Sequence, residues 1–178
     1  PASKIVLWYG AIVLFLVLLN RKKMPPFFLL PFSLACLLLA RPAFGFEIDI
    51  LDVGQGDGIY ISTGDQTSLF IDGGSTDVKN VGAYRILPFL KCRGIRAIDY
   101  WFVSHCDADH INGLCEVLEA GYPVKNLAVS EYMPNDAAFR SLKKLALRHK
   151  IPILTMGCGD AVIGKKGNWA IKSLSRKP

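Results

Sequence analysis

Residues 98–110 run Ile98-Asp99-Tyr100-Trp101-Phe102-Val103-Ser104-His105-Cys106-Asp107-Ala108-Asp109-His110, an apolar stretch followed directly by side chains that can bind metals. The stretch Ile98 to Val103 predicts a buried strand, and the pattern of Ile111 to Ala120 predicts a helix after it. Metal-ligand side chains therefore stand where a strand ends and a helix begins, the usual place for an active site in an α/β protein. This segment predicts an α/β fold with its site at the strand ends.

The run holds four candidate metal ligands: His105, Asp107, Asp109 and His110. Imidazole nitrogens and carboxylate oxygens suit Zn²⁺, Mn²⁺ or a pair of such ions. In the alternative interpretation Asp107 and Asp109 only cap the helix, and the histidines are incidental. We favour metal binding, because two of the three histidines in the chain flank the run. Cys106 is expected to be a small buried side chain, since neighbours on an extended segment point in opposite directions.

The charge of the chain is unevenly distributed. Of the formal net charge of +6, residues 1–45 carry +5, with five basic residues and no acid, and the rest of the chain carries +1. A general argument for nucleic-acid binding from the overall charge therefore fails, although a local basic patch remains open. The five cysteines form no CxxC pattern, so they predict neither a disulfide framework nor a zinc knuckle.

Two uncharged runs, Ile5 to Asn20 and Met24 to Ala40, flank the basic cluster Arg21-Lys22-Lys23. Each run spans about 24–26 Å as a helix, slightly less than the roughly 30 Å thickness of the bilayer core. We expect residues 1–45 to form a transmembrane helical hairpin with a cytoplasmic loop, which places the remainder of the chain outside the cytoplasm. A signal peptide ending near Ala43-Phe44-Gly45 is the alternative. Both predict a domain over residues 46–178, in a multi-pass protein of the cell membrane if the hairpin is correct.

Beyond residue 45 the pattern predicts strands first and then alternating strands and helices, which indicates a layered α/β sandwich. Gly54 to Gly58 is a Gly-rich turn, and Pro88 is expected to kink the helix that contains it. A final hairpin is expected around Gly164 to Gly167. The expected strands are Phe46–Val53, Ile59–Ser62, Ser68–Ile71, Ile98–Val103, Val124–Val129 and Ile153–Thr155, and the expected helices are Val81–Arg93, Ile111–Ala120 and Asp136–Lys150.

His105-x-Asp107-x-Asp109-His110 resembles the first ligand motif of the metallo-β-lactamase superfamily, with Asp in place of the second His. Together with Leu51-Asp52-Val53-Gly54-Gln55-Gly56-Asp57, Ile71-Asp72-Gly73-Gly74 and Pro88-Phe89-Leu90-Lys91-Cys92-Arg93-Gly94-Ile95, it resembles the C-terminal domain of ComEC-type competence proteins. Those membrane proteins pass incoming DNA across the cytoplasmic membrane. The resemblance implies a partial αββα sandwich preceded by two transmembrane helices and truncated at its C-terminus.

The resemblance also implies roles for individual residues. His105 and Asp107 would bind one metal ion, Zn or Mn, and Asp109 and His110 a second ion. Asp109 would orient or deprotonate the attacking water. Asp72 would support the ligands from a strand end, unless Asp72-Gly73-Gly74 is a plain turn. Asp57 is a second supporting candidate, although closing the Gly-rich hairpin is the slightly favoured interpretation.

Later ligands of that superfamily, a bridging Asp and further His, have no clear equivalent here. His149 is expected on the surface of a helix, and Asp160 in a turn that enters a strand. We therefore expect weak metal binding and little or no DNA cleavage from this chain.

The implied function is a metal-dependent, nuclease-like hydrolase domain of a DNA-uptake protein, with DNA, the bilayer and other parts of a competence channel as partners. Two alternatives remain open: a non-catalytic domain that docks DNA or a protein, and a hydrolase for another ester. Basic residues of the helix near the end of the chain offer DNA contacts, although an ordinary solvated face is the favoured interpretation. These residues are Arg140, Lys143, Lys144, Arg148 and Lys150, with Lys165 and Lys166 similarly ambiguous.

Overall fold

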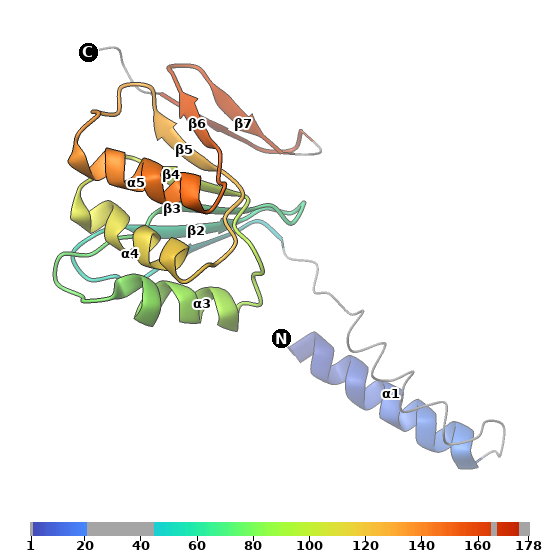
Figure 1. The fold of residues 1–178 in the computed structure, drawn as a ribbon. Helices are drawn as coiled ribbons and strands as arrows, with labels where there is room; N and C mark the ends of the chain where they lie inside the picture. The colour runs from blue at the N-terminus through green and yellow to red at the C-terminus, as the bar shows by residue number, and fades with distance from the viewer. Residues whose placement is uncertain (1, 21–44, 165–166, 175–178) are drawn as a thin grey trace. The chain divides into compact units, whose positions relative to one another are not determined.

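The computed structural model describes residues 2–20, 45–164 and 167–174. The chain divides into two units, Pro1–Ala43 and Phe44–Pro178. In the first unit, α1 (Ala2–Asn20) covers the first apolar run (Figure 1). The second predicted span, Met24 to Ala40, lies outside the described residues. Among the residues that are described, no helix combines the length and the apolar character needed to cross a membrane.

A six-stranded sheet forms the second unit, in the order β1-β2-β3-β4-β5-β6. The first three strands are antiparallel because short loops join them, and β3 to β6 are parallel because the chain crosses over through helices. Two further strands pair with each other, β7 (Ala161–Ile163) and β8 (Ala170–Lys172). The sheet strands are β1 (Glu47–Ile50), β2 (Gly58–Ser62), β3 (Ser68–Asp72), β4 (Tyr100–Val103), β5 (Leu127–Ser130) and β6 (Ile153–Met156).

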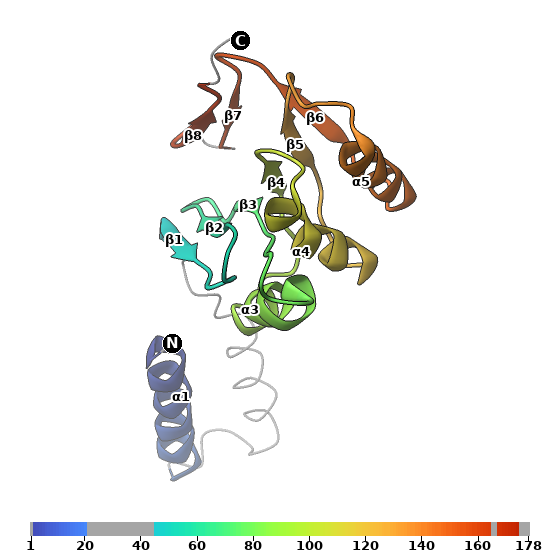
Figure 2. The same ribbon diagram turned by 90° about the vertical axis from the view of Figure 1, so that its left-hand side faces the viewer.

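Helices cover one face of this sheet, which confirms the predicted α/β class (Figure 2). They are α3 (Leu87–Cys92), α4 (Ala108–Glu119) and α5 (Ala137–Arg148). The helix predicted over Val81–Arg93 is present from Val81 to Cys92, but its first part is π-helical: η2 (Gly82–Ile86) runs directly into α3. Pro88 lies just after the π-helical part, and its ring nitrogen has no hydrogen to donate, so the ladder of hydrogen bonds is irregular where the kink was expected.

The core lies between the sheet and the helical layer. Trp101 and Phe70, both fully buried, stack with ring centroids 4.3 Å apart. Leu114 of α4 and Leu142 of α5 pack into the same cluster. Burial of each large apolar side chain contributes roughly 1.5–3 kcal/mol, so these contacts fix α4 and α5 on the sheet.

The opposite face of the sheet is also apolar. The strand register puts Ile59, Ile71 and Phe102 in line across β2, β3 and β4, with Ile61 and Tyr100 on the same face. Within residues 45–164 and 167–174 no helix packs over this face (Figure 2). A sheet that is apolar on both faces is typical of an inner layer.

Candidate metal centre

Asp72 organises the centre from the end of β3. Its side chain is buried, and it accepts hydrogen bonds from the Ser104 backbone N–H and the Ser104 hydroxyl, both at 2.8 Å. Ser104 follows β4, which pairs in parallel with β3, so the two strand ends meet at one edge of the sheet. The backbone of Asp72 has a φ of 56°, a left-handed conformation that Asp tolerates better than most residues. The indole N–H of Trp101 donates to the Asp72 carbonyl at 2.6 Å and holds this turn in place.

The same carboxylate fixes both histidines of the motif. His110 Nδ1 lies 3.1 Å from Asp72 Oδ2, and His105 Nδ1 lies 2.9 Å from the Ser104 hydroxyl. Because the Ser104 hydroxyl gives its own proton to Asp72, it accepts a proton from His105 Nδ1. Both imidazoles are thereby assigned the tautomer in which Nε2 carries a free lone pair. A carboxylate behind a ligating imidazole is the arrangement found at protein metal sites.

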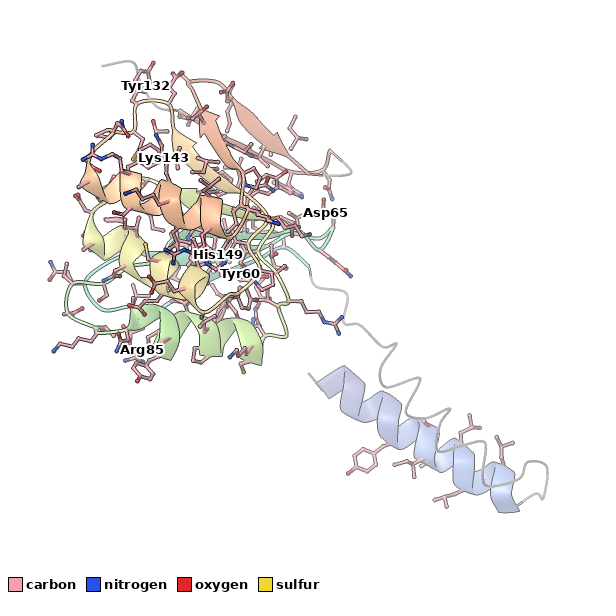
Figure 3. The ribbon with its side chains drawn as sticks, in the orientation of Figure 1. Tyr60, Asp65, Arg85, Tyr132, Lys143 and His149 are labelled. Atoms are coloured by element: carbon pink, nitrogen blue, oxygen red, sulfur yellow. The ribbon has the colours of Figure 1, made fainter. Side chains whose placement is uncertain are left out.

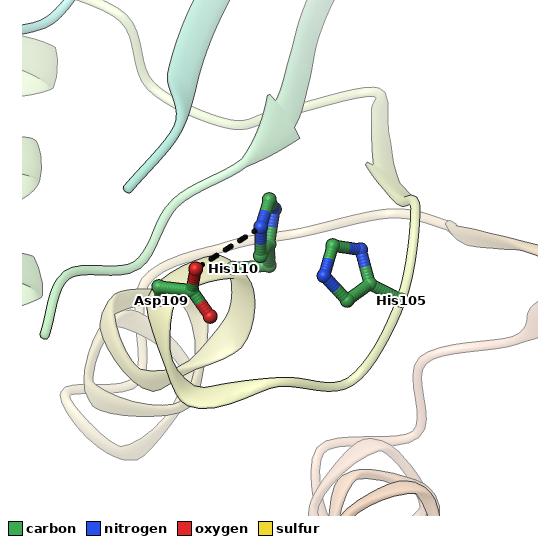
Figure 4. A group of neighbouring side chains, drawn as sticks. All are labelled: His105, Asp109 and His110. Carbon is green, nitrogen blue, oxygen red and sulfur yellow. Dashed lines mark ion pairs between the residues drawn. The ribbon is translucent and has the colours of Figure 1, made fainter. Parts of the chain in front are cut away.

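The ligand atoms of His105, Asp109 and His110 all lie within 4.8 Å of one another (Figure 4). The two imidazole rings are 3.7 Å apart between centroids, and Asp109 Oδ2 lies 3.4 Å from His110 Nε2. Asp109 and His110 stand in the first turn of α4, whereas His105 stands in the loop before it. One imidazole from the loop therefore meets a carboxylate and an imidazole from the helix.

Asp107 lies outside this group of three. It occupies the N-cap position of α4, but its side chain makes no capping hydrogen bond. Its carboxylate is 76% exposed and lies 3.5 Å from His105 Nε2. The helix-capping alternative therefore finds no support at Asp107, and this residue stands beside His105 at the edge of the centre.

Asp57 belongs to a second group, with Asp72 and His110, whose ligand atoms also lie within 4.8 Å of one another. Asp57 Oδ2 lies 3.7 Å from His110 Nδ1, and its side chain is 59% exposed. The Gly-rich turn therefore directs this carboxylate toward the centre as well as closing the hairpin.

Glycines allow three segments to approach closely at the site: the Gly-rich turn 54–58, the Gly73-Gly74 pair and the start of α4. A Cβ on Gly74 would collide with the backbone of Asp109 and His110, and one on Gly56 would lie 2.6 Å from the Asp109 carbonyl. Hydrogen bonds join the same segments, since Asp57 N–H donates to the Asp109 carbonyl and Gly74 N–H donates to the Asp57 carbonyl. Both glycine motifs thus set the backbone position of the ligand helix.

Ser104, Ser75 and Asn112 are supporting residues that the sequence did not single out. Asn112 of α4 accepts a hydrogen bond from the Ser75 backbone N–H and donates to the Ser75 carbonyl. Such contacts span 37 residues in sequence. In the sequence, only the position of Ser75 directly after Asp72-Gly73-Gly74 could have indicated that it supports the site.

Cys106 is buried, as expected, and its Sγ lies 3.7 Å from Met133 Sδ. Burial raises the pKa of the Cys106 thiol to about 11, which favours the neutral thiol. His149 differs from expectation: it is half-buried, and its Nε2 is enclosed without a hydrogen-bond partner among the described residues. Asp160 accepts a hydrogen bond from Gly157 N–H, as the predicted turn requires.

The charges at the centre favour a cation. Asp57, Asp72, Asp107 and Asp109 surround two imidazoles, and in the described part of the chain no Lys or Arg forms an ion pair with any of these carboxylates. The donor set of nitrogens and carboxylate oxygens fits Zn²⁺ or Mn²⁺.

Two curated proteins are similar in sequence. ComE operon protein 3 of Bacillus subtilis is 26% identical over 65% of this chain. Recombination protein 2 of Haemophilus influenzae is 34% identical over 48% of this chain. The chain is a distant homologue of the ComEC-type competence proteins. It spans 16% and 10% of the lengths of these ComEC-type relatives. No protein-family model matches the chain.

Two solved structures resemble part of the fold. A diphosphatase of the PhnP family is 19% identical with a TM-score of 0.36, covering 60% of this chain and 39% of that protein. A metallo-β-lactamase from Hirschia baltica is 15% identical with a TM-score of 0.37, covering 67% of this chain and 52% of that protein. Because both TM-scores lie below 0.5, the ComEC-type homology rests on the two sequence relatives.

Proposed function

We propose that residues 46–178 belong to a metal-dependent hydrolase domain that acts on DNA phosphodiester bonds in a DNA-uptake protein. The observation that carries the proposal is the convergence of His105, Asp109 and His110, with the Nδ1 atoms of both imidazoles engaged by the Asp72–Ser104 pair. A bound divalent cation supplies Lewis acidity and lowers the pKa of a coordinated water.

Each residue has a separate part in this proposal. The Nε2 atoms of His105 and His110 are the nitrogen ligands. Asp109 offers one carboxylate oxygen to the cation and retains another that can orient a water or accept its proton. Asp72 acts through the histidines, because it holds their ring orientation and tautomer without reaching the reacting atoms. Asp107, exposed beside His105, is the candidate for a second ion.

The three proposed ligands, His105, Asp109 and His110, all come from residues 105–110, so the proposed metal site is open on its other sides. Catalytic zinc sites hold three protein ligands and keep the fourth position for water, so these three residues suffice for one ion and leave a second ion without a full set. We therefore expect this chain to bind metal weakly and to cleave DNA slowly. A non-catalytic DNA-docking domain is the second candidate, and this incomplete ligand set is the observation that favours it.

We also propose that the N-terminal apolar runs anchor the domain at the cell membrane, with the domain on the extracytoplasmic side. The support is the basic cluster Arg21-Lys22-Lys23 between two uncharged runs, together with the homology to ComEC-type proteins. Other segments of a competence channel would then be its partners.

Calorimetric titration with Mn²⁺ and Zn²⁺, and nicking of labelled duplex DNA with Mn²⁺, test the metal proposal. The variants are Asp109→Asn and His110→Ala, with Glu119→Gln at the exposed end of the same helix as control. We expect both site variants to lose metal binding and nicking, and the control to retain them. Nicking that survives both substitutions rejects the hydrolase proposal, and metal binding without nicking in the unmodified chain supports the docking candidate.

A further inference from the structure

The exposed face of α5 concentrates positive charge in an otherwise acidic unit. The segment 137–150 carries five cations and no acid: Arg140, Lys143, Lys144, Arg148 and Lys150. Residues 46–178 have a net charge of +1, so without this segment they would carry −4. All five side chains are exposed. In the described part of the chain none of them forms an ion pair, so their charges are available to a partner.

These cations form an ordered row. Arg140, Lys144 and Arg148 recur every four residues, which places them along one side of the helix over about 12 Å. Phosphates of one DNA strand follow each other every 3.4 Å along the duplex axis, so a row of this length faces roughly three or four of them. Lys143 is held beside the row, with its ammonium 4.1 Å from the centre of the Phe139 ring.

The row begins near the metal centre. α5 starts at the same sheet edge as α4, because each follows the carboxyl end of a parallel strand. The loop that enters α5 touches the metal-binding loop, through the Met133 contact with Cys106. The guanidinium of Arg140 donates to the Asn135 carbonyl of this loop at 2.6 Å. A phosphate chain lying on α5 would therefore extend from the candidate site.

A lipid surface fits these observations less well. Helices that lie on membranes present an apolar face beside the basic one. The apolar face of α5, formed by Phe139, Leu142 and Leu145, is buried in the core. The exposed face carries one large apolar residue, Leu147, so it has little to insert into a bilayer.

We infer that the exposed face of α5 is a contact surface for the DNA phosphate backbone, an inference that rests on the proposed function because it assigns the DNA partner of that domain. The helix exposes no aromatic side chain on which bases could stack. Binding through this surface is therefore independent of base sequence and weakens steeply with salt.

The test measures the affinity of the full chain for a fluorescent duplex in EDTA, so that cleavage plays no part. The α5 variant combines Arg140→Glu, Lys144→Glu and Arg148→Glu. The control combines Lys79→Glu, Arg85→Glu and Lys91→Glu, the same change of charge on exposed residues in or near η2 and α3. Figure 3 shows Lys143 on α5 and Arg85 in η2, next to α3, at opposite edges of the helical layer. Circular dichroism checks that each protein is folded.

We expect the α5 variant to weaken the Kd roughly tenfold or more, and to reduce the slope of log K against log salt by about 2.7. The control is expected to change the Kd less than about threefold, and duplexes of unrelated sequence to bind alike. Equal weakening by both variants, or no DNA binding by the unmodified chain, overturns the inference. The inference is also overturned if the α5 variant loses binding to phosphatidylserine vesicles but keeps its affinity for DNA, because the surface would then bind lipid.

These results are separable from those for the metal site. The α5 variant is expected to leave Mn²⁺ affinity unchanged, because none of its three substituted residues belongs to the candidate metal centre. If the chain binds DNA through α5 but never nicks it, the hydrolase proposal is rejected and the DNA contact surface on α5 is retained. If the α5 variant nicks DNA and binds it with an unchanged Kd, the contact surface on α5 is rejected and the hydrolase proposal is retained.

Discussion

The Asp72 carboxylate lies 3.1 Å from His110 Nδ1, although 38 residues separate the two in sequence. The contact joins the end of β3 to the first turn of α4. It is a charge-assisted hydrogen bond when His110 Nδ1 carries the proton, and its burial strengthens it. Since the Ser104 hydroxyl binds the same oxygen, one carboxylate orients both imidazoles of the candidate centre.

Replacing Asp72 should therefore weaken metal binding without removing a ligand. Asp72→Asn leaves one acceptor oxygen for contacts that now use two, so the histidine orientations are loosened. We expect Zn²⁺ or Mn²⁺ affinity to fall about 10–100-fold, measured by calorimetric titration. Nitrogen NMR of the imidazoles should also show a mixture of tautomers, which a purely structural role would not produce. Unchanged affinity and tautomers in Asp72→Asn would contradict the positioning role.

The close approach at Gly74 predicts a second effect. Gly74→Ala places a Cβ against the backbone of Asp109 and His110, so the start of α4 must move. We expect a loss of stability of about 1–3 kcal/mol, measured by urea unfolding, together with weaker metal binding. Gly64→Ala is the matched control, because nothing lies within 4 Å of its added Cβ. Equal stability of the two variants would show that the close contact between Gly74 and the start of α4 is not required for the fold.

Core packing of α4 gives a third prediction. Leu114 is fully buried in the main cluster, whereas Leu147 on α5 is 79% exposed. Leu114→Ala should lower the free energy of unfolding by about 2–5 kcal/mol, because it leaves a cavity. Leu147→Ala should change it by less than about 0.5 kcal/mol. Chemical denaturation of both variants makes the comparison, and a cost at Leu147 similar to that at Leu114 would refute this packing of the core.

Asp99 gives a pH-dependent prediction. Burial tends to raise the pKa of its carboxyl, but hydrogen bonds from Lys125 and Ser68 outweigh burial and hold that pKa below its ordinary value of 3.8. A carboxyl whose pKa is lower in the folded state stabilises the fold above pH 3.8 and loses that contribution as the pH falls further.

Asp99→Asn should therefore reduce stability at pH 7 and make a smaller difference at pH 3. Urea unfolding at both pH values tests this, with Glu119→Gln as the control that is expected to change little at either pH. A deficit of Asp99→Asn that grows on acidification would reverse the predicted sign and reject the assignment.

Much of the fold was predictable because its signals are local. The apolar stretch before His105 predicted β4, and the periodicity after His110 predicted α4. The strand is shorter than expected, and the helix begins earlier. The sequence did not predict that the turns before Pro88 are π-helical, nor that Gly82 lies so close to α4 that a Cβ on it would collide with the Gly113 carbonyl. Periodicity carries no information about such an approach.

The sequence by itself determined the kinds of donor, their place after a strand and the separation of the apolar N-terminal runs from the α/β unit. These features arise from side-chain chemistry and from hydrophobic repeats that act over a few residues. The tertiary structure alone decided that His105 joins Asp109 and His110 while Asp107 stands aside, and that Asp72 supports both imidazoles. Parallel pairing of β3 with β4 brings the two strand ends together, and such pairing joins residues too distant for any local pattern to specify.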